Sequence, residues 1–181
     1  MAEIPHELAE AVSSSDAVPG SGWVAGVSGS LAAALVVKVA SRSEGWLGAE
    51  GARAQALELR DRLLALAGQD ARAYERALSA LEERGSTLQR ALVRAAEVPL
   101  AIAETAADVA ELAAQAAEAA DGAERADASA AAALASGAAR AAARLVEVNL
   151  ATIAEDERVS RARRAAEAGD EAAKSALAAE L

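Results

Sequence analysis

The apolar part of this chain is mostly alanine, and this feature constrains the fold more than any other. Hydrophobic residues fill 54% of the 181 positions, yet aromatic residues make up only 2% and phenylalanine is absent. With so few large side chains to fill gaps between layers, the backbones must pack closely together. Alanine is also the best helix former, and no stretch shows the alternation typical of a strand. The composition therefore predicts an all-α fold of tightly packed helices.

One stretch near the N-terminus differs from plain amphipathic helix. Pro19, Gly20 and Ser21 form a turn that leads directly into an apolar helix, which we expect over residues 23–41. Each glycine in a helix costs about 1 kcal/mol relative to alanine, so several on one face indicate close helix packing or a ligand. One face of this helix carries the small residues Gly22, Gly26, Gly29 and Ala33.

The charge balance and the absences exclude several classes of protein. The net charge is −10, with both signs interspersed, which argues against nucleic acid as a partner. There is no cysteine and only one histidine, His6, so we expect no disulfide and no metal site. No basic region precedes an apolar run at the start, and the run over 23–37 is shorter than the ~20 residues that span a bilayer. We predict a cytoplasmic protein with no membrane partner.

Helical periodicity predicts a single domain over residues 1–181, folded as an up-and-down bundle with short loops. We expect Gly68 to end one helix, and Pro99 to kink the longest one. The core is expected over about residues 4–160, and residues 161–181 as a loosely packed tail broken near Gly169. The predicted helices are 3–12, 23–41, 52–67, 70–83, 87–120, 127–154 and 157–181.

Five short motifs occur in a fixed order along the chain. They are Pro19-Gly20-Ser21-Gly22, Asp70 followed by Ala73-Tyr74, Glu97-Val98-Pro99-Leu100, Ala126-Asp127-Ala128, and Val146-Glu147-Val148-Asn149-Leu150. Over about residues 4–160, their order and spacing resemble the cyclodeaminase/cyclohydrolase family. This family comprises the C-terminal domain of formiminotransferase-cyclodeaminase and the methenyltetrahydrofolate cyclohydrolases. The chain departs from the family pattern at Ser21 and Trp23, where the family has glycine and serine.

The resemblance implies a homodimeric enzyme that acts on a one-carbon unit of a tetrahydrofolate derivative, a small-molecule substrate, without a covalently bound cofactor. The reaction would be ring closure with loss of ammonia, as in an ammonia-lyase, or ring opening by water, as in a cyclohydrolase. The face of small residues also favours a homodimer. The departures at Ser21 and Trp23 leave two alternatives open. One is a divergent enzyme for a non-folate cyclisation, dehydration or deamination in a specialised pathway, and the other is a non-catalytic helical binding scaffold.

Two carboxylates are the candidate catalytic groups, Asp127 and Asp70. A carboxylate in a partly dry cleft has a raised pKa and can shuttle a proton, and it also stabilises a cationic carbon. Each of the two could instead be the N-cap of a helix. The clustered arginines near the C-terminus could bind a polyglutamate or phosphate tail, or form a solvated, paired face. They are Arg158, Arg161, Arg163 and Arg164.

The candidate substrate-binding residues lie in three of the motifs. Backbone N–H groups at the start of a helix could hold an anion, although tight packing alone also explains the turn. Trp23 could stack on a flat ligand or fill a dimer seam, and Tyr74 is expected in the core with its hydroxyl bonded. Asn149 could orient a ligand or bond a neighbouring helix. The full set is Pro19, Gly20, Ser21, Gly22, Trp23, Tyr74 and Asn149.

Overall fold

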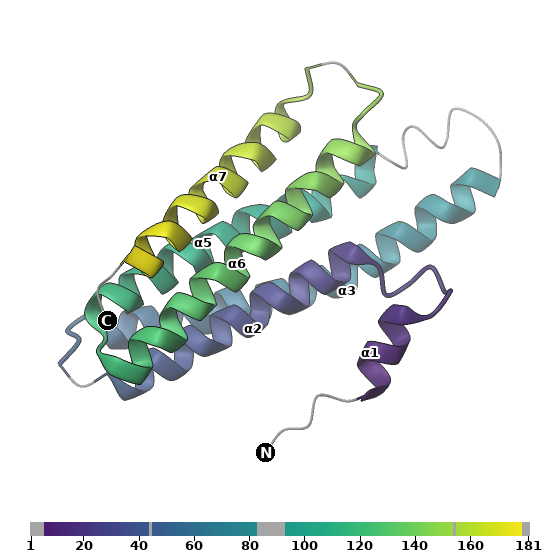
Figure 1. Ribbon diagram of the computed structural model, residues 1–181. Helices are drawn as coiled ribbons and strands as arrows, with labels where there is room; N and C mark the ends of the chain where they lie inside the picture. Colours follow the sequence, from purple (N-terminus) through teal and green to yellow (C-terminus); the bar gives the residue numbers. More distant parts are fainter. Residues whose placement is uncertain (1–5, 44, 83–92, 154, 179–181) are drawn as a thin grey trace.

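All regular secondary structure in the described part of the chain is helical, which confirms the predicted fold class (Figure 1). The structure is a computed structural model that describes residues 6–43, 45–82, 93–153 and 155–178, with residues 77–82 described by their backbone alone. The helices are α1 His6–Ser13, α2 Ser21–Arg42, α3 Ala49–Glu82, α5 Glu97–Ala119, α6 Gly122–Asn149 and α7 Glu157–Ala178.

The five long helices run side by side as a bundle with α5 at its centre (Figure 1). α5 packs against α2, α3, α6 and α7, and most of its residues are buried. α2 lies between α3 and α6, and α7 covers α5 and α6. Within the described residues α1 packs against none of the other helices and buries none of its own residues.

The glycine face of α2 packs on α3 inside the protomer. A Cβ atom added to Gly26 would lie 2.9 Å from the Cβ of Ala67, and one added to Gly29 would lie 3.1 Å from Cδ1 of Leu63. The helices approach closely because these positions carry no side chain, as the alanine-rich composition predicted. This face is therefore occupied within one protomer and gives no support to a homodimer.

Several helix boundaries differ from the predicted ones. α3 is continuous through Gly68 and Asp70, so Gly68 ends no helix and Asp70 is not an N-cap. α6 begins at Gly122, and Asp127 lies inside it rather than at its N-cap. α7 is unbroken at Gly169, and it buries Gly169 and a row of alanines against α5 and α6 rather than packing loosely. At Gly68 and Gly169, close packing on neighbouring helices outweighs the local glycine signal.

Pro99 lies in the first turn of α5, where a missing N–H breaks no essential bond. The helix starts at Glu97, after a turn at Ala96 whose carbonyl accepts the N–H of Leu100 at 3.2 Å. Residues 87–92, where the longer predicted helix would begin, lie outside the described part of the chain. Residues 93–95 are helical as well, so the described chain has a one-residue break in the helix at Ala96, three residues before Pro99. The kink at Pro99 itself stays a prediction.

Among the described residues, α2 is the one helix whose length and composition would allow it to cross a bilayer. Half of its most apolar stretch is buried inside the bundle. The core helix of a folded bundle can have the same length and composition, so this property does not distinguish a membrane span from a core helix.

Candidate active site

A cavity of about 300 Å³ opens at the N-terminal end of α2. The turn before α2 forms one side, and α3, the start of α5 and the end of α6 form the others. It brings together six of the nine predicted site residues, which come from three separate motifs. The described lining residues are Ala17, Val18, Gly20, Ser21, Gly22, Asp70, Tyr74, Pro99, Leu145, Val148 and Asn149.

Asp70 is the one charged side chain among the described lining residues. It lies half-buried on α3, and its carboxyl group fills the space beside Gly22, where any Cβ would overlap it. The backbone N–H of Trp23 donates a hydrogen bond to this carboxylate. Gly20, at the N-cap of α2, has no side chain that could accept such a bond. Asp70 therefore supplies from α3 the acceptor that an N-cap residue normally provides.

The surroundings of Asp70 favour proton exchange. Burial raises the pKa of the Asp70 carboxyl above its ordinary value of 3.8, and the hydrogen bond from Trp23 opposes this to a smaller extent. The positive end of the α2 dipole faces the carboxylate and acts in the same direction as this hydrogen bond, because it stabilises the ionised form. A carboxyl group with a raised pKa in a cavity can act as an acid and a base in turn.

Tyr74 and Asn149 add polar groups to the rim and end of this cavity. Asn149 is half-buried as the last residue of α6. Tyr74 is 47% exposed, so its predicted place in the core was wrong. α3 contacts Gly22 at the start of α2 through Asp70, and Tyr74 lies one turn further along α3, which extends past the beginning of α2 (Figure 1). Tyr74 therefore lines the cavity with a half-exposed side chain.

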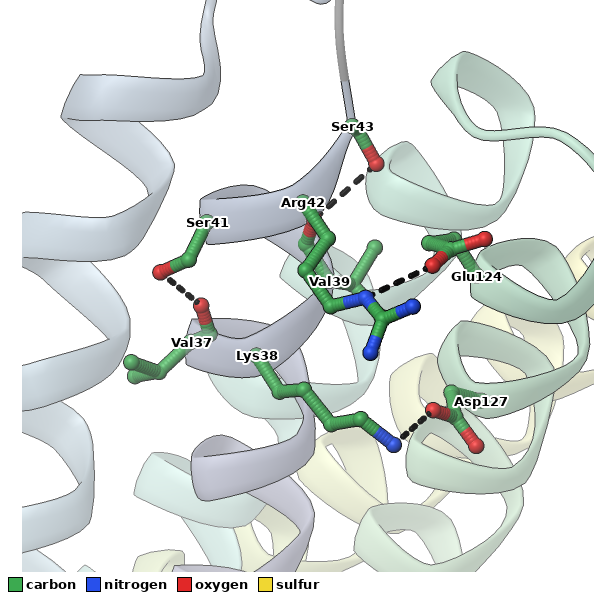
Figure 2. Close-up of polar contacts among 8 residues, drawn as sticks. All are labelled: Val37, Lys38, Val39, Ser41, Arg42, Ser43, Glu124 and Asp127. Atoms are coloured by element: carbon green, nitrogen blue, oxygen red, sulfur yellow. Dashed lines mark hydrogen bonds and ion pairs between the residues drawn. The ribbon is translucent and has the colours of Figure 1, made fainter.

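Asp127 lies at the opposite end of α2 from the cavity. Its carboxylate accepts a hydrogen bond from Nζ of Lys38 at 2.6 Å, next to the pair of Arg42 and Glu124 at 2.8 Å (Figure 2). At about 1.5 Å of rise per residue, Gly22 and Lys38 are about 24 Å apart along α2. One protomer therefore does not bring Asp127 and Asp70 together.

Comparison of the sequence and the fold with known proteins shows which family this chain resembles. The family model for formiminotransferase-cyclodeaminase matches residues 5–168. The chain belongs to the formiminotransferase-cyclodeaminase family. A solved structure, the formiminotetrahydrofolate cyclodeaminase of Thermotoga maritima, superposes with a TM-score of 0.83 at 26% identity. The match covers 94% of this chain and 93% of that chain. No curated protein matches the sequence. The family that the five motifs resembled is thus confirmed.

Ser21 and Trp23, the two departures from the family turn, lie differently with respect to the cavity. Ser21 lines the cavity, whereas Trp23 is half-buried and is not among the described lining residues. Trp23 contributes its backbone N–H to Asp70 rather than a ring that fills the cavity. Pro19, which follows a cis peptide bond, lines a neighbouring groove instead. The tryptophan side chain therefore leaves the described part of the cavity open.

Sequence reasoning missed the apolar walls of the cavity. Pro99, Leu145 and Val148 line it, although Pro99 was assigned only a kink and the other two were assigned no role in the site. The motifs around Pro99 and Asn149 carried the signal, because both are part of the family pattern. Each of these residues lies at an end of its helix, close to where α2 begins.

The described residues contain no group of three or more acidic or histidine side chains that could hold a metal ion. Three of the four clustered arginines near the C-terminus pair with carboxylates at 2.7 Å. Their partners are Asp156 for Arg158, Glu104 for Arg161 and Glu147 for Arg163. These pairs correspond to the solvated, paired face rather than to a site for an anionic tail.

Proposed function

We propose that this protein is a cyclodeaminase that closes a ring on 5-formiminotetrahydrofolate and releases ammonia, with the reaction in the cavity at the start of α2. The observation that carries this proposal is the Asp70 carboxyl group in a cavity built from the family motifs. The formiminotetrahydrofolate cyclodeaminase that matches most of the chain supports the choice of reaction. The type of enzyme is then an ammonia-lyase rather than a cyclohydrolase.

The chemistry requires one proton to move between two nitrogens. Nitrogen 10 attacks the carbon of the protonated formimino group and forms the new C–N bond. Its proton passes to the Asp70 carboxylate, and the resulting acid delivers it to the amino nitrogen on the same carbon. The C–N bond to that nitrogen then breaks, ammonia leaves, and the electron pair of the ring nitrogens stabilises the methenyl cation. Asp70 ends the cycle ionised and faces this cation.

The other polar groups of the cavity have positioning roles in this proposal. Ser21, Tyr74 and Asn149 can bond the polar edges of the substrate, while Pro99 and Leu145 exclude water from the reacting carbon. A partly dry site keeps the Asp70 pKa raised, so that the carboxyl group can both accept and return the proton.

The remaining assignments are part of the same proposal. We take residues 1–181 as one domain, the protein as a cytoplasmic homodimer, and the small-molecule substrate as the only ligand required for turnover. Asp127 has no role in the cavity of its own protomer in this scheme, because it is paired with Lys38 far from Asp70.

The test is to incubate the purified protein with 5-formiminotetrahydrofolate and to follow both ammonia release and the absorbance of the methenyl product. We expect turnover above that in buffer, and a loss in kcat of about 10²–10⁴-fold in Asp70→Asn. Asp127→Asn is the matched control and should retain activity. Absence of turnover by the wild type, or an equal loss in both variants, contradicts the proposal. Opening of the methenyl ring without any ammonia release would instead identify a cyclohydrolase.

A further inference from the structure

An apolar groove of about 610 Å³ adjoins the cavity that contains Asp70. It runs between α2 and α6, with Val12 of α1 at its edge. Gly20 and Ser21 line both the groove and the cavity, so the two spaces meet at the turn before α2. A ligand whose reacting atoms lie beside this turn can therefore extend into both.

The groove suits a flat, uncharged group. None of its described lining residues is charged. Ala25 and Ala138, which are 3% and 4% exposed, form its floor, and Val24 and Leu134 form its sides. Because alanine side chains are short, the space between the two helices stays open at this point. An aromatic ring would bury its faces here without leaving a polar group unpaired.

Gly137 also lines the groove and has no packing role in the protomer. A Cβ added to it would meet no atom within 4 Å, in contrast to Gly22, Gly26 and Gly29. A glycine inside a helix lowers helix stability relative to alanine. The absence of a side chain at this position therefore keeps the groove open on the side of α6 and is not required for the packing of α6 in the protomer.

The size of the cavity points to the same ligand, given the proposed function. About 300 Å³ is at the lower end of the roughly 300–1,000 Å³ found for small-molecule sites, and a tetrahydrofolate derivative has a polar pterin and an aminobenzoyl ring. We infer that the groove between α2 and α6 binds the aminobenzoyl ring of the substrate, while the pterin occupies the cavity. Nitrogen 10 is bonded directly to that ring, so this arrangement places it beside Gly20 and Ser21, where the two spaces meet.

The binding of p-aminobenzoylglutamate to the whole protein tests this inference by calorimetry, without any need for turnover. Ala141 is exposed and lines the groove but not the cavity, so Ala141→Trp fills the groove alone. Ala130→Trp is the matched control, because Ala130 is exposed on the same helix and lines neither space. We expect Ala141→Trp to weaken binding on the order of tenfold or more and to raise the KM for substrate with little change in kcat. Ala130→Trp should change neither.

Three outcomes overturn the inference. The wild type does not bind p-aminobenzoylglutamate, or both tryptophan variants bind it equally well, or Ala141→Trp changes the oligomeric state and leaves binding intact. The last result would show that a second copy of the chain covers the groove. If Ala141→Trp does not fold, Ala133→Trp provides a second exposed position in the groove. Failure of the proposed function appears differently, as binding of the fragment without turnover of the substrate.

Discussion

The carboxyl group of Asp70 on α3 occupies the space that a side chain at Gly22 of α2 would need. Position 22 therefore has to be glycine for the carboxylate to reach the N-terminus of α2 and accept the N–H of Trp23. This contact connects the packing of α2 on α3 with the candidate catalytic group. A substitution at Gly22 should therefore change the position of the Asp70 carboxyl group.

Gly22→Ala should displace the Asp70 carboxyl group and reduce both stability and activity. Forcing an additional methyl group into a packed site commonly costs about 1–3 kcal/mol. Urea denaturation measures this loss, and ammonia release measures the activity. Gly51→Ala is the matched control, since an added Cβ there meets no atom within 4 Å. It should increase the free energy of unfolding by about 1 kcal/mol. Equal effects of the two substitutions would contradict the contact.

Gly137→Ala should make the protein more stable and a poorer enzyme. The position is open in the protomer, so alanine should stabilise α6 by about 1 kcal/mol. The same methyl group narrows the groove, and kcat/KM for the substrate should fall. Thermal unfolding and steady-state kinetics measure the two effects. A stabilised variant with unchanged kcat/KM would indicate that the groove is wider than its ligand requires.

Asp70→Asn should alter how stability depends on pH. Burial raises the pKa of Asp70 in the folded protein above 3.8, so the folded state holds this proton more tightly than the unfolded state does. The wild type therefore loses this contribution as pH rises from about 4 through the raised pKa, and the asparagine variant does not. The stability of Asp70→Asn relative to wild type should increase over that range. Denaturation at a series of pH values checks it, and a constant difference would argue against the burial of the charge.

Asp156→Asn should weaken the start of α7 in a pH-dependent way. Asp156 accepts the backbone N–H of Arg158 at 2.9 Å and two bonds from its guanidinium group, which lower the pKa of Asp156 to about 2. The ionised carboxylate thus stabilises the folded protein above about pH 4, and the effect is lost as pH falls toward about 2. The stability difference between wild type and variant should shrink over this interval in urea titrations. A difference that grows on acidification would contradict the pairing.

The sequence was sufficient to predict the bundle and the family. Periodicity indicated the helices, and the small side chains along α2 indicated a close approach that the structure places against Ala67 and Leu63. The predicted helix breaks at Gly68 and Gly169 were wrong, because packing between helices outweighs the low helix propensity of a single glycine. α3 passes through Gly68 without a break, because packing on α2 and α5 stabilises the continuous helix.

The site was predicted only in part, for a physical reason. The spacing of residues along one helix does not show which turn of a neighbouring helix those residues contact. Asp70 and Asp127 both resembled caps at helix starts, and their separation depends on how α2 lies against α3 and α6. Tyr74 follows the apolar period of its helix, yet it is 47% exposed. It lies one turn beyond Asp70, which meets the start of α2, and sequence alone does not show where a neighbouring helix begins.

The glycines that meet α3 also fix how far α2 can slide. Moving α2 by a single residue would bring Trp23 or Val27 against α3, where Gly22 and Gly26 now fit. In the proposed reaction, the register of these two helices, rather than the conformation of a loop, sets the distance over which the proton would travel to and from Asp70. The contact between Asp70 and the N-terminus of α2 should therefore keep its geometry as long as the two helices hold this register.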